Sequence, residues 1–355
     1  MRMRVAINGF GRIGRRFLWA ALEQDSFDVV AINDPAEAAT LAHLLRYDSV
    51  HGMAPHDVVV EGEALYVGGR RITLCHDLDP RRLPWRALNI DLVAECSGRM
   101  TTREHAGQHC EAGARRVAIS APGQELDGTF CYGINHQDYD PQCHRLVSNA
   151  SCTTNCLAAV CRVVLDSCGL RSAMMNTVHP YTNGQPLLDS AHGDLRRSRG
   201  GAGALIPTTT GATRAVVEVL PQLKGRISGM SVRVPVADVS ILDLVVEMEK
   251  PLCVQQANDA FRQAADGPLH GVLACNDLPL VSRDYLGHPA SAIIDTLSTQ
   301  VVGTRLLRVI AWYDNEAGYA HRLADLVGHM ARREMACGRS SVSATDFRQQ
   351  GVCHG

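Results

Sequence analysis

The spacing of hydrophobic residues at the start of the chain changes twice within the first 34 positions. Residues 3–8, MRVAIN, form a short apolar run typical of a buried strand, and residues 27–34, FDVVAIND, form another. Between them the segment RRFLWAALEQ repeats its apolar residues at the spacing of an amphipathic helix. This order predicts a strand–helix–strand unit in which the two strands are parallel.

The glycine-rich segment GFGRIG joins the first strand to this helix. Gly9, Gly11 and Gly14 match the spacing G-x-G-x-x-G. The first two glycines allow a tight turn close to a pyrophosphate, the third lets the helix pack against the strand, and the positive end of the helix faces the phosphates. A tight turn in an unrelated α/β domain is the alternative, but the strand–helix–strand context favours a dinucleotide site.

Asp34 ends the second strand. At that position a carboxylate can accept hydrogen bonds from the ribose diol of adenosine and would repel a 2′-phosphate, which favours NAD over NADP. The alternative is that Asp34 only opens the loop before Pro35.

Further strand signals complete the first half of the chain. Hairpin signals lie around residues 57–75, and two strands are predicted at 90–98, IDLVAECSG, and 115–122, RRVAISAP. Both end in small residues with glycine or proline, as strands do when their carboxyl ends line a cofactor crevice. We therefore expect an NAD-binding domain over residues 1–150 with a Rossmann-type, doubly wound parallel sheet.

The hydrophobic pattern changes after Cys152. The helical segment CLAAVCRVVLDSCG is followed by the alternating runs SAMMNTVHPYT, GRISGMSVRVPV, VSILDLVVEME and TRLLRVIAWYD, which predict a mostly antiparallel sheet. We expect a second, α+β domain over residues 151–315. The segment GYAHRLADLVGHMARRE predicts a helix within 316–335 that completes the first domain, and residues 336–355 are expected to form a tail.

The composition narrows the class of protein. The 355 residues are 46% hydrophobic and 20% charged with a formal net charge of −2, which describes a globular protein without an overall attraction to nucleic acid or membranes. No apolar run of roughly 18 residues predicts a transmembrane helix, and the amino-terminal segment lacks the pattern of a secretion signal. The thirteen cysteines are therefore expected to be reduced thiols, and their spacing with histidines matches no metal site.

Two cysteines lie four residues apart in SNASCTTNC, residues 148–156, where a metal clip, a disulfide or a nucleophile would each be an explanation. Cys152 lies where a strand ends and a helix begins, so the helix dipole would stabilise its thiolate. His179 is the expected partner, because an imidazole can lower the pKa of a thiol and move protons. Cys156 is expected to pack inside the helix.

Several segments of the chain occur in the order and spacing found in the glyceraldehyde-3-phosphate dehydrogenase family. They are NGFGRIGR, SNASCTTNC, HPYTNGQ, LRRSRG, PTTTGA, RVP and WYDNE. The resemblance covers about residues 3–335, and SCTTNC followed by WYDNE is its most specific part. It implies a phosphorylating aldehyde dehydrogenase of glycolysis that uses NAD, a phosphorylated aldehyde and inorganic phosphate, and that forms a cytoplasmic homotetramer.

The resemblance also implies roles for particular residues. Cys152 resembles the catalytic nucleophile and His179 its activator. The positions that resemble cofactor contacts are Gly9, Gly11, Arg12, Ile13, Gly14, Asp34, Ser97, Ser120 and Asn315. The positions that resemble the two phosphate pockets are Ser151, Thr153, Thr182, Arg197, Thr210, Gly211 and Arg233. Hydroxyls, backbone N–H groups and arginines suit phosphate, and no metal is implied.

The mechanism implied by the resemblance has four steps. The Cys152 thiolate attacks the aldehyde to give a hemithioacetal, with His179 handling the hydroxyl proton. Hydride passes to the nicotinamide and leaves a thioester. The thioester is activated for acyl transfer, and inorganic phosphate then attacks it and releases an acyl phosphate.

Some positions depart from the family pattern. Gly184 stands where the family usually carries aspartate or another polar residue beside the substrate-phosphate pocket, and Leu78 stands where many members have a basic residue near the adenine. Ala317 replaces the tryptophan of YDNEWG, and Pro35 and Ser190–Ala191 also differ. These departures suggest a divergent paralogue with altered cofactor affinity or substrate choice.

Other functions are compatible with some of the same residues. Erythrose-4-phosphate dehydrogenase shares the cysteine, histidine and cofactor apparatus, but it departs at the segment after the histidine and at TTTGA, which this chain retains. A redox sensor would use an oxidisable Cys152 without turnover, and weak use of NADP is opposed only by Asp34. The arginines at 196, 197 and 199 lie in a loop that the family packs between subunits, so a nucleic-acid role is not expected.

Overall fold

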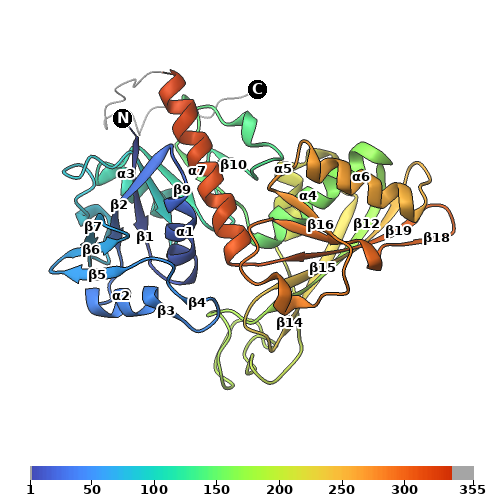
Figure 1. The fold of residues 1–355 in the computed structure, drawn as a ribbon, viewed down its shortest axis with the longest axis horizontal. Helices are drawn as coiled ribbons and strands as arrows, with labels where there is room; N and C mark the ends of the chain where they lie inside the picture. Colours follow the sequence, from blue (N-terminus) through green and yellow to red (C-terminus); the bar gives the residue numbers. More distant parts are fainter. Residues whose placement is uncertain (1, 338–355) are drawn as a thin grey trace. The chain divides into compact units, whose positions relative to one another are not determined.

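The structure is a computed structural model that describes residues 2–337 and divides into two compact units (Figure 1). The first unit contains the chain up to Phe130, the segment His136–Ala150 and the chain from Leu323 onward. The second contains Cys131–Asn135 and Ser151–Arg322. The predicted tail lies outside the described residues from position 338.

The first unit is built on a nine-stranded sheet. Its strands from β10 to β7 run parallel, and the hairpin strands β6 and β5 continue the sheet in the antiparallel sense. In spatial order the strands are β10 (Gly128–Thr129), β11 (Leu146–Ser148), β9 (Arg116–Ile119), β8 (Leu92–Glu95), β1 (Met3–Asn8), β2 (Phe27–Asn33), β7 (Arg70–Cys75), β6 (Ala64–Val67) and β5 (Val58–Glu61). The predicted parallel Rossmann-type sheet is confirmed, with the hairpin where it was expected. A separate short ribbon pairs β3 (Tyr47–Asp48) with β4 (Gly52–Met53).

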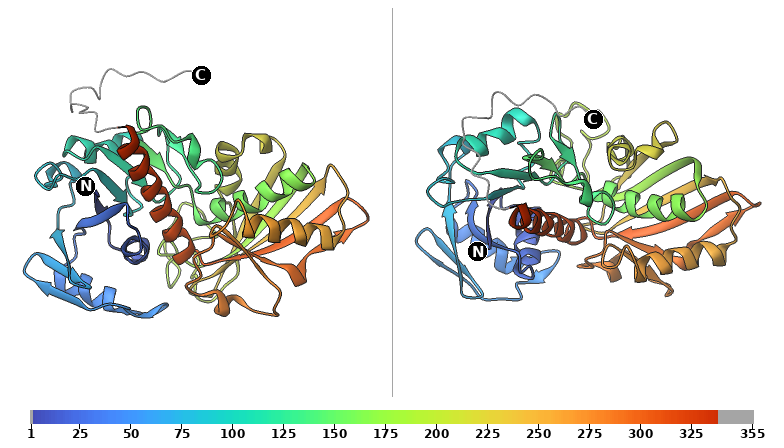
Figure 2. Two further views of the ribbon diagram at one scale, coloured as in Figure 1. Left: turned by 45° about the horizontal axis from the view of Figure 1, so that its top comes forward. Right: turned by 90° about the horizontal axis from the view of Figure 1, so that it is seen from above.

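The helices of this unit are α1 (Arg12–Leu22), α2 (Ala38–Arg46), α3 (Arg103–Glu111) and the part of α7 (Ala317–Cys337) that follows Arg322. Helix α7 runs beside α1 (Figure 2). Gln24 Nε2 donates to Asp325 Oδ1 at 3.1 Å, and the Tyr139 hydroxyl donates to Glu334 Oε1 at 3.2 Å. These bonds attach the carboxyl-terminal helix to the first unit.

The second unit is built on an eight-stranded, mostly antiparallel sheet, as predicted. Two neighbouring pairs are nevertheless parallel, namely β12 with β14 and β16 with β17. In spatial order the strands are β13 (Ile206–Thr208), β14 (Ile227–Val234), β12 (Leu170–Pro180), β15 (Ser240–Met248), β19 (Leu306–Tyr313), β17 (Ala292–Asp295) and β16 (Leu273–Asn276), with β18 (Gln300–Val302) paired to β19.

One face of this sheet is covered by helix α4 (Cys152–Ser167), with α5 (Ala212–Val219) and α6 (Val254–Asp266) beside it (Figure 1). Because side chains alternate along a strand, the buried residues Met175, Thr177 and His179 of β12 share the face toward α4. The same alternation therefore aims His179 at the helix that begins with Cys152.

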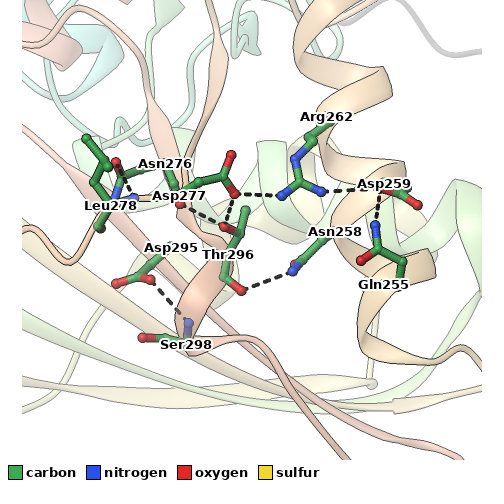
Figure 3. A network of polar contacts seen from close by, with 10 residues as sticks. All are labelled: Gln255, Asn258, Asp259, Arg262, Asn276, Asp277, Leu278, Asp295, Thr296 and Ser298. Atoms are coloured by element: carbon green, nitrogen blue, oxygen red, sulfur yellow. Dashed lines mark hydrogen bonds and ion pairs between the residues drawn. The ribbon is translucent and has the colours of Figure 1, made fainter.

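Polar contacts hold α6 against the end of β16, as Figure 3 shows. Arg262 Nη2 donates to Asp277 Oδ1 at 2.6 Å, and Asn258 Nδ2 donates to the Thr296 carbonyl at 3.0 Å. Arg262 Nη1 also contacts Asp259 Oδ1 at 3.2 Å. This network fixes the outer helix of the sheet and is separate from the site described below.

Among residues 2–337, none of the helices has the length and apolar character needed to cross a membrane.

Candidate active site

The glycine turn after β1 is shaped by two close backbone approaches. Gly9 has a φ of +88°, and a Cβ there would lie 2.5 Å from the Cα and N of Ser97. A Cβ at Gly14 would lie 2.2 Å from the Gly9 carbonyl oxygen. Only glycine fits at either position, so the first and third glycines of the motif set the turn and the approach of α1.

The amino terminus of α1 is open where the second glycine lies. Gly11 is the N-cap, no side chain caps the helix, and no acidic residue occupies the first turn. A Cβ at Gly11 would meet nothing within 4 Å. Unlike the other two, this glycine leaves open space beside backbone N–H groups, which suits an anion such as the pyrophosphate of NAD.

Arg12 and Ile13 open α1 and are both partly buried. Arg12 Nη1 contacts Asp48 Oδ2 at 2.7 Å. Burial raises the pKa of Asp48, but N–H donors from His51 and Val50 together with Arg12 outweigh it and lower the pKa to about 2. Asp48 is therefore ionised and ties Arg12 to β3, the short strand after α2.

Asp34 lies beside the glycine turn, after the end of β2. Its Oδ2 accepts from the Phe10 N–H at 2.8 Å, and its Oδ1 accepts from the Ala36 N–H at 3.0 Å. Each carboxylate oxygen keeps a second acceptor site. The Asp34 side chain is thus oriented by the backbone and still has the acceptors that a ribose diol needs.

Glu95 belongs to a buried polar network whose members were not among the predicted site residues, apart from Ser97. Glu95 Oε1 accepts from the Ser97 N–H at 2.7 Å, and Oε2 accepts from Asn8 Nδ2 at 2.6 Å. His109 Nε2 lies 2.9 Å from the same Oε2, and Trp85 Nε1 donates to His109 Nδ1 at 3.1 Å. An indole N–H only donates, so Nδ1 carries the lone pair and Nε2–H donates to Glu95.

This network supports the predicted cofactor contact Ser97. It orients the Ser97 backbone, which lies against Gly9. Ser120 follows β9 in the same unit, and its N–H donates to the Glu95 carbonyl at 2.9 Å. A signal was present in the sequence, because Glu95 is an acidic residue inside an otherwise apolar strand, where an unpaired charge would be costly.

In the second unit, Cys152 is the first residue of α4. Ser151 is the N-cap, and its Oγ accepts from the Thr154 N–H at 3.1 Å. Ala150, just before the cap, has a φ of +55°, a left-handed conformation that turns the chain sharply into the helix. Cys152 and Cys156 are free thiols, which excludes a disulfide between them. Cys156 lies one turn further along α4 and is buried, as predicted.

The structure brings Cys152, His179 and Arg233 together. Cys152 Sγ lies 3.5 Å from His179 Nε2. His179 Nδ1 lies 2.6 Å from Arg233 Nη1 and 2.9 Å from the Pro180 carbonyl oxygen, which also accepts from Arg233 Nη1 at 3.0 Å. His179 and Arg233 are direct neighbours in register across the parallel pair β12–β14. The imidazole therefore lies between the thiol and the guanidinium.

The protonation states of this cluster follow from burial and charge. Burial raises the pKa of the Cys152 thiol, while the Arg233 charge and hydrogen bonds from Thr153 oppose that rise without cancelling it. This differs from the expectation that the helix dipole and the imidazole lower it, because taking a thiolate out of water costs more than these groups recover. Burial and Arg233 also lower the pKa of His179 to about 3, so its imidazole is neutral at physiological pH.

Tyr313, which was not among the predicted site residues, links the site to its surroundings. Its hydroxyl lies 2.8 Å from Thr153 Oγ1 and 2.7 Å from Thr177 Oγ1. The Tyr313 ring meets the His179 ring edge-on, with centroids 6.3 Å apart. Burial raises the pKa of Tyr313, so it remains a neutral support beneath the Cys152 turn.

Arg197 and Thr210 occupy the loop region around β13. Arg197 Nε donates to Thr208 Oγ1 at 2.7 Å, and Nη2 donates to the Thr209 carbonyl at 3.3 Å. Thr210 Oγ1 accepts from the Ala212 N–H at 3.2 Å beside Gly211, the N-cap of α5. Thr208 was not among the predicted contacts.

The remaining predicted positions are less connected to the cluster. Thr182 is exposed, and its carbonyl accepts from the Gln185 N–H at 2.8 Å. Asn315 is buried, with Oδ1 accepting from Ser240 Oγ at 2.8 Å. Ser120 and Asn315, both predicted near the nicotinamide, belong to different units.

The structure shows the surroundings of three positions that depart from the family pattern. A Cβ at Gly184 would meet only Thr182 Oγ1, at 3.7 Å, so a larger side chain would fit there. Leu78 is 69% exposed, and Ala317 is buried at the start of α7. None of these positions strains the fold.

Comparison with known proteins gives the same family for both units. Residues 3–103 match the glyceraldehyde 3-phosphate dehydrogenase NAD binding domain, and residues 151–315 match the C-terminal domain of that family. A protein named glyceraldehyde-3-phosphate dehydrogenase from Geobacillus stearothermophilus is 50% identical over 333 residues, which is 94% of this chain and 99% of the relative. Glyceraldehyde-3-phosphate dehydrogenase 2 from Bacillus subtilis is 47% identical over 94% of this chain and 98% of the relative. Glyceraldehyde-3-phosphate dehydrogenase 2 from Trichormus variabilis is 46% identical over 93% of this chain and 99% of the relative.

Proposed function

The chain belongs to the glyceraldehyde-3-phosphate dehydrogenase family of NAD-dependent oxidoreductases, and we propose that it oxidises glyceraldehyde 3-phosphate with NAD and phosphate to 1,3-bisphosphoglycerate, reversibly. The observation that carries the proposal is the Cys152 thiol on the first residue of α4, 3.5 Å from His179 Nε2. A neutral imidazole within reach of a thiol can take up its proton as the thiolate forms, and this arrangement activates a cysteine nucleophile.

Cys152 performs the covalent chemistry. Its thiolate attacks the aldehyde carbon to form a hemithioacetal, and the oxygen that develops charge lies within reach of His179 Nε2. Bound NAD would supply the acceptor for the hydride of the hemithioacetal, and Cys152 then holds the acyl group as a thioester. Inorganic phosphate attacks the thioester carbonyl, and the Cys152 thiolate leaves as the acyl phosphate forms.

Hydroxyl and guanidinium groups of the second unit hold the phosphates. Arg233 lies beside the Cys152–His179 pair, and Arg197 lies against the hydroxyl of Thr208. With Ser151, Thr153, Thr182, Thr210 and Gly211 they provide donors for a substrate phosphate and an attacking phosphate. Arginine suits this role because its planar guanidinium can bind two phosphate oxygens at once.

The first unit holds NAD. Gly9, Gly14 and the open amino terminus of α1 at Gly11 receive the pyrophosphate, and Asp34 receives the adenosine ribose. Arg12, Ile13, Ser97, Ser120 and, from the second unit, Asn315 complete the predicted set of cofactor contacts. The Asp34 carboxylate disfavours a 2′-phosphate, so NADP is the weaker cofactor.

The protein works as a cytoplasmic homotetramer in this proposal. The sheet face of the second unit opposite α4 carries exposed apolar side chains, with Met174 64%, Met230 42% and Leu306 44% exposed. The loop between β12 and β13 adds the exposed leucines Leu187, Leu188, Leu195 and Leu205. Apolar surface of this kind suits contact with a second copy. A cytoplasmic location suits a nucleophile that works only as a reduced thiol.

Oligomerisation is tested by light scattering on the purified protein. Met174→Lys places a charge on the exposed sheet face and is expected to shift the protein to smaller assemblies. Met335→Lys, at a 53% exposed position on α7, is the matched control and is expected to leave the assembly unchanged. A monomeric wild type at assay concentrations would contradict the tetramer.

The activity is tested by following NADH formation from NAD and glyceraldehyde 3-phosphate, with and without inorganic phosphate. Phosphate-dependent turnover in the wild type and in Cys143→Ser, an exposed cysteine, but not in Cys152→Ala, is the expected result. Erythrose 4-phosphate and NADP are run in parallel to rank the aldehydes and the cofactors. A folded, reduced wild type without turnover on either aldehyde would contradict the proposal and leave a redox-sensing role for Cys152.

The cofactor site is tested by a pair of glycine variants. Gly14→Ala is expected to lower the free energy of unfolding by about 1–3 kcal/mol, because its Cβ would overlap the Gly9 carbonyl. Gly11→Ala is expected to keep the stability and to weaken NAD binding, measured by calorimetry, because its Cβ would enter only the open space. Unchanged NAD affinity in Gly11→Ala would place the pyrophosphate elsewhere.

A further inference from the structure

Three neighbouring strands of the first unit end in polar residues that are buried. Glu95 ends β8, Asn8 ends β1 and Asn33 ends β2. They are direct partners in register, since Asn8 pairs with Glu95 on one side and with Asn33 on the other. All three lie inside the fold, with exposed fractions of 4% or less. We call these three residues the edge chain, because they follow the carboxyl edge of the parallel sheet.

Hydrogen bonds connect the edge chain in one direction. Asn8 Nδ2 donates to Glu95 Oε2 at 2.6 Å, and Asn33 Nδ2 donates to Asn8 Oδ1 at 2.7 Å. Asn33 also binds both backbone groups of Asp77. Its Oδ1 accepts from the Asp77 N–H at 3.0 Å, and its Nδ2 donates to the Asp77 carbonyl at 2.9 Å. The hydrogen bonds therefore run from a carboxylate on β8 to the loop that follows β7.

The Glu95 carboxylate sets this direction. Its two further partners, the Ser97 N–H and the His109 Nε2–H, are donors as well, so Glu95 acts as an acceptor toward all of them. Asn8 must then present its NH₂ group to Glu95, which leaves its oxygen for Asn33. Asn33 must in turn present its NH₂ group to Asn8, which leaves its oxygen for the backbone N–H of the loop. Each amide thus has one orientation, and the carboxylate charge polarises the bonds along the chain.

The edge chain borders the predicted cofactor contacts. Each of its residues is followed within two positions by one of them, namely Ser97, Gly9 and Asp34. The loop that contains Asp77 is the neighbour of Asp34, whose N–H donates to the Cys75 carbonyl at 3.1 Å. Ligands of a parallel sheet bind outside the carboxyl ends of its strands. Because Asp34 is the proposed ribose contact, this loop lies on the adenosine side of the NAD site.

We infer that Asn8 and Asn33 are positioning residues, which carry the polarity of the Glu95 carboxylate to the Asp77 backbone and so fix the loop beside the adenosine of NAD. The part that concerns NAD rests on the proposed function, whereas the fixed loop is a property of the free protein. Buried amides lower stability unless each of their groups is hydrogen-bonded. Apolar side chains could fill these strand ends without that cost, so holding the cofactor turns is a reason for amides here.

The loop is measured by hydrogen exchange with mass spectrometry on the full-length protein without NAD. Glu95→Gln keeps the shape of the side chain but brings an NH₂ group toward donors, so Asn8 is expected to turn, and Asn33 with it. The Asp77 N–H then loses its acceptor. Exchange in a peptide covering residues 76–79 is expected to become about tenfold faster, the equivalent of one hydrogen bond. Unchanged exchange in this peptide would overturn the inference.

Asp91→Asn is the matched control. Asp91 precedes β8 at the opposite, amino-terminal edge of the same strands, and its Oδ2 accepts from the Arg4 N–H at 2.9 Å. This variant is expected to leave exchange at 76–79 unchanged. A rise equal to that in Glu95→Gln would show a general loosening of the sheet and would contradict the inference. If Glu95→Gln does not fold, Asn8→Leu, which breaks the middle of the edge chain, takes its place with the same expected results.

Binding and kinetics connect the loop with NAD. Glu95→Gln and Asn33→Leu are each expected to raise the KM for NAD about tenfold and to leave kcat within about twofold, since only cofactor binding is weakened. AMP carries the adenosine but not the nicotinamide, and its dissociation constant from calorimetry is expected to rise by the same factor. Unchanged AMP affinity would refute the positioning role. A wild type that binds neither NAD nor AMP would contradict the proposed function, while hydrogen exchange would still test the edge chain.

A double variant tests whether the edge chain acts as a unit. Glu95 and Asn33 lie on strands separated by β1, so they are linked through Asn8. Breaking either end releases the same loop. Glu95→Gln combined with Asn33→Leu is therefore expected to raise the AMP dissociation constant by about the same tenfold as each single variant. A rise of about a hundredfold, the product of two independent effects, would show that the two residues act separately and would overturn the inference.

Discussion

His109 in the first unit and His179 in the second are two buried histidines in closely similar settings. Each has its Nδ1 beside a group that can only donate, Trp85 for His109 and Arg233 for His179. The two differ at Nε2, which meets the Glu95 carboxylate at 2.9 Å in one case and the Cys152 thiol at 3.5 Å in the other.

The difference shows how the same residue type, histidine, serves stability at one position and chemistry at another. His109 completes a closed network, because its Nε2 meets a carboxylate that also accepts from Asn8 and from the Ser97 N–H. His179 faces a partly exposed thiol that can gain and lose a substrate. A satisfied network orients its neighbours, whereas an imidazole beside a reactive thiol is available to the reaction.

The largest expected effect follows from removing the Cys152 thiol, which His179 faces. Cys152→Ala should lower kcat by about 10⁴-fold or more, since the nucleophile is removed, and should leave the NAD dissociation constant within a few fold. Steady-state kinetics and calorimetry on the same preparation check both. Turnover that survives at a tenth of the wild-type rate would show that another cysteine carries the reaction.

Loss of His109 should affect stability and not chemistry. His109→Ala leaves the buried Glu95 carboxylate short of a donor and the Trp85 N–H without an acceptor, so the free energy of unfolding should fall by about 3–5 kcal/mol in urea titrations. His109→Gln is the control, because its amide can accept from Trp85 and donate to Glu95. Equal losses in the two variants would show that packing, and not the network, is responsible.

The low pKa of His179 predicts an acid-dependent loss of stability. The pKa of His179 is about 3 in the folded protein against an ordinary value of 6.5, so only the unfolded chain gains this proton between those two pH values. The free energy of unfolding is unaffected by His179 above pH 6.5. It decreases as the pH falls below that value, by up to about 1.4 kcal/mol per pH unit, and the decrease levels off near pH 3.

Urea titrations at a series of pH values check this prediction. His179→Gln cannot titrate, so the difference between wild type and variant isolates His179 from other histidines such as His329, whose pKa is also lowered by burial, to about 4. Parallel curves for the two proteins would mean that His179 has the same pKa in the folded and the unfolded chain, which would contradict the prediction.

The smallest expected effect follows from removing the Trp85 N–H, which donates to His109. Trp85→Phe keeps most of the buried ring and removes the Nε1–H, so the free energy of unfolding should fall by about 1 kcal/mol from the lost hydrogen bond, with a further contribution from the smaller ring. NMR of labelled histidine should then show His109 exchanging between tautomers. A retained Nε2–H tautomer would show that Glu95 alone is sufficient to hold it.

Much of the first unit was predictable because its signals are local. The turn, helix and acidic residue of a dinucleotide site lie within one strand–helix–strand segment, from Gly9 to Asp34, and the requirement for glycine at two of the three positions is visible in the backbone. Glu95 was missed because the other members of its network, Asn8, Trp85 and His109, come from separate parts of the chain.

By itself the sequence determined the two sheet types, the order of the elements and the residue types able to bind a dinucleotide and to form a thioester, because hydrophobic period and turn chemistry are local properties. Only the tertiary structure decided that β12 and β14 pair in parallel within a mostly antiparallel sheet, with His179 opposite Arg233. Strand order and register between segments more than fifty residues apart are set by packing of the whole sheet against α4. That packing places the Arg233 guanidinium beside the imidazole that faces Cys152.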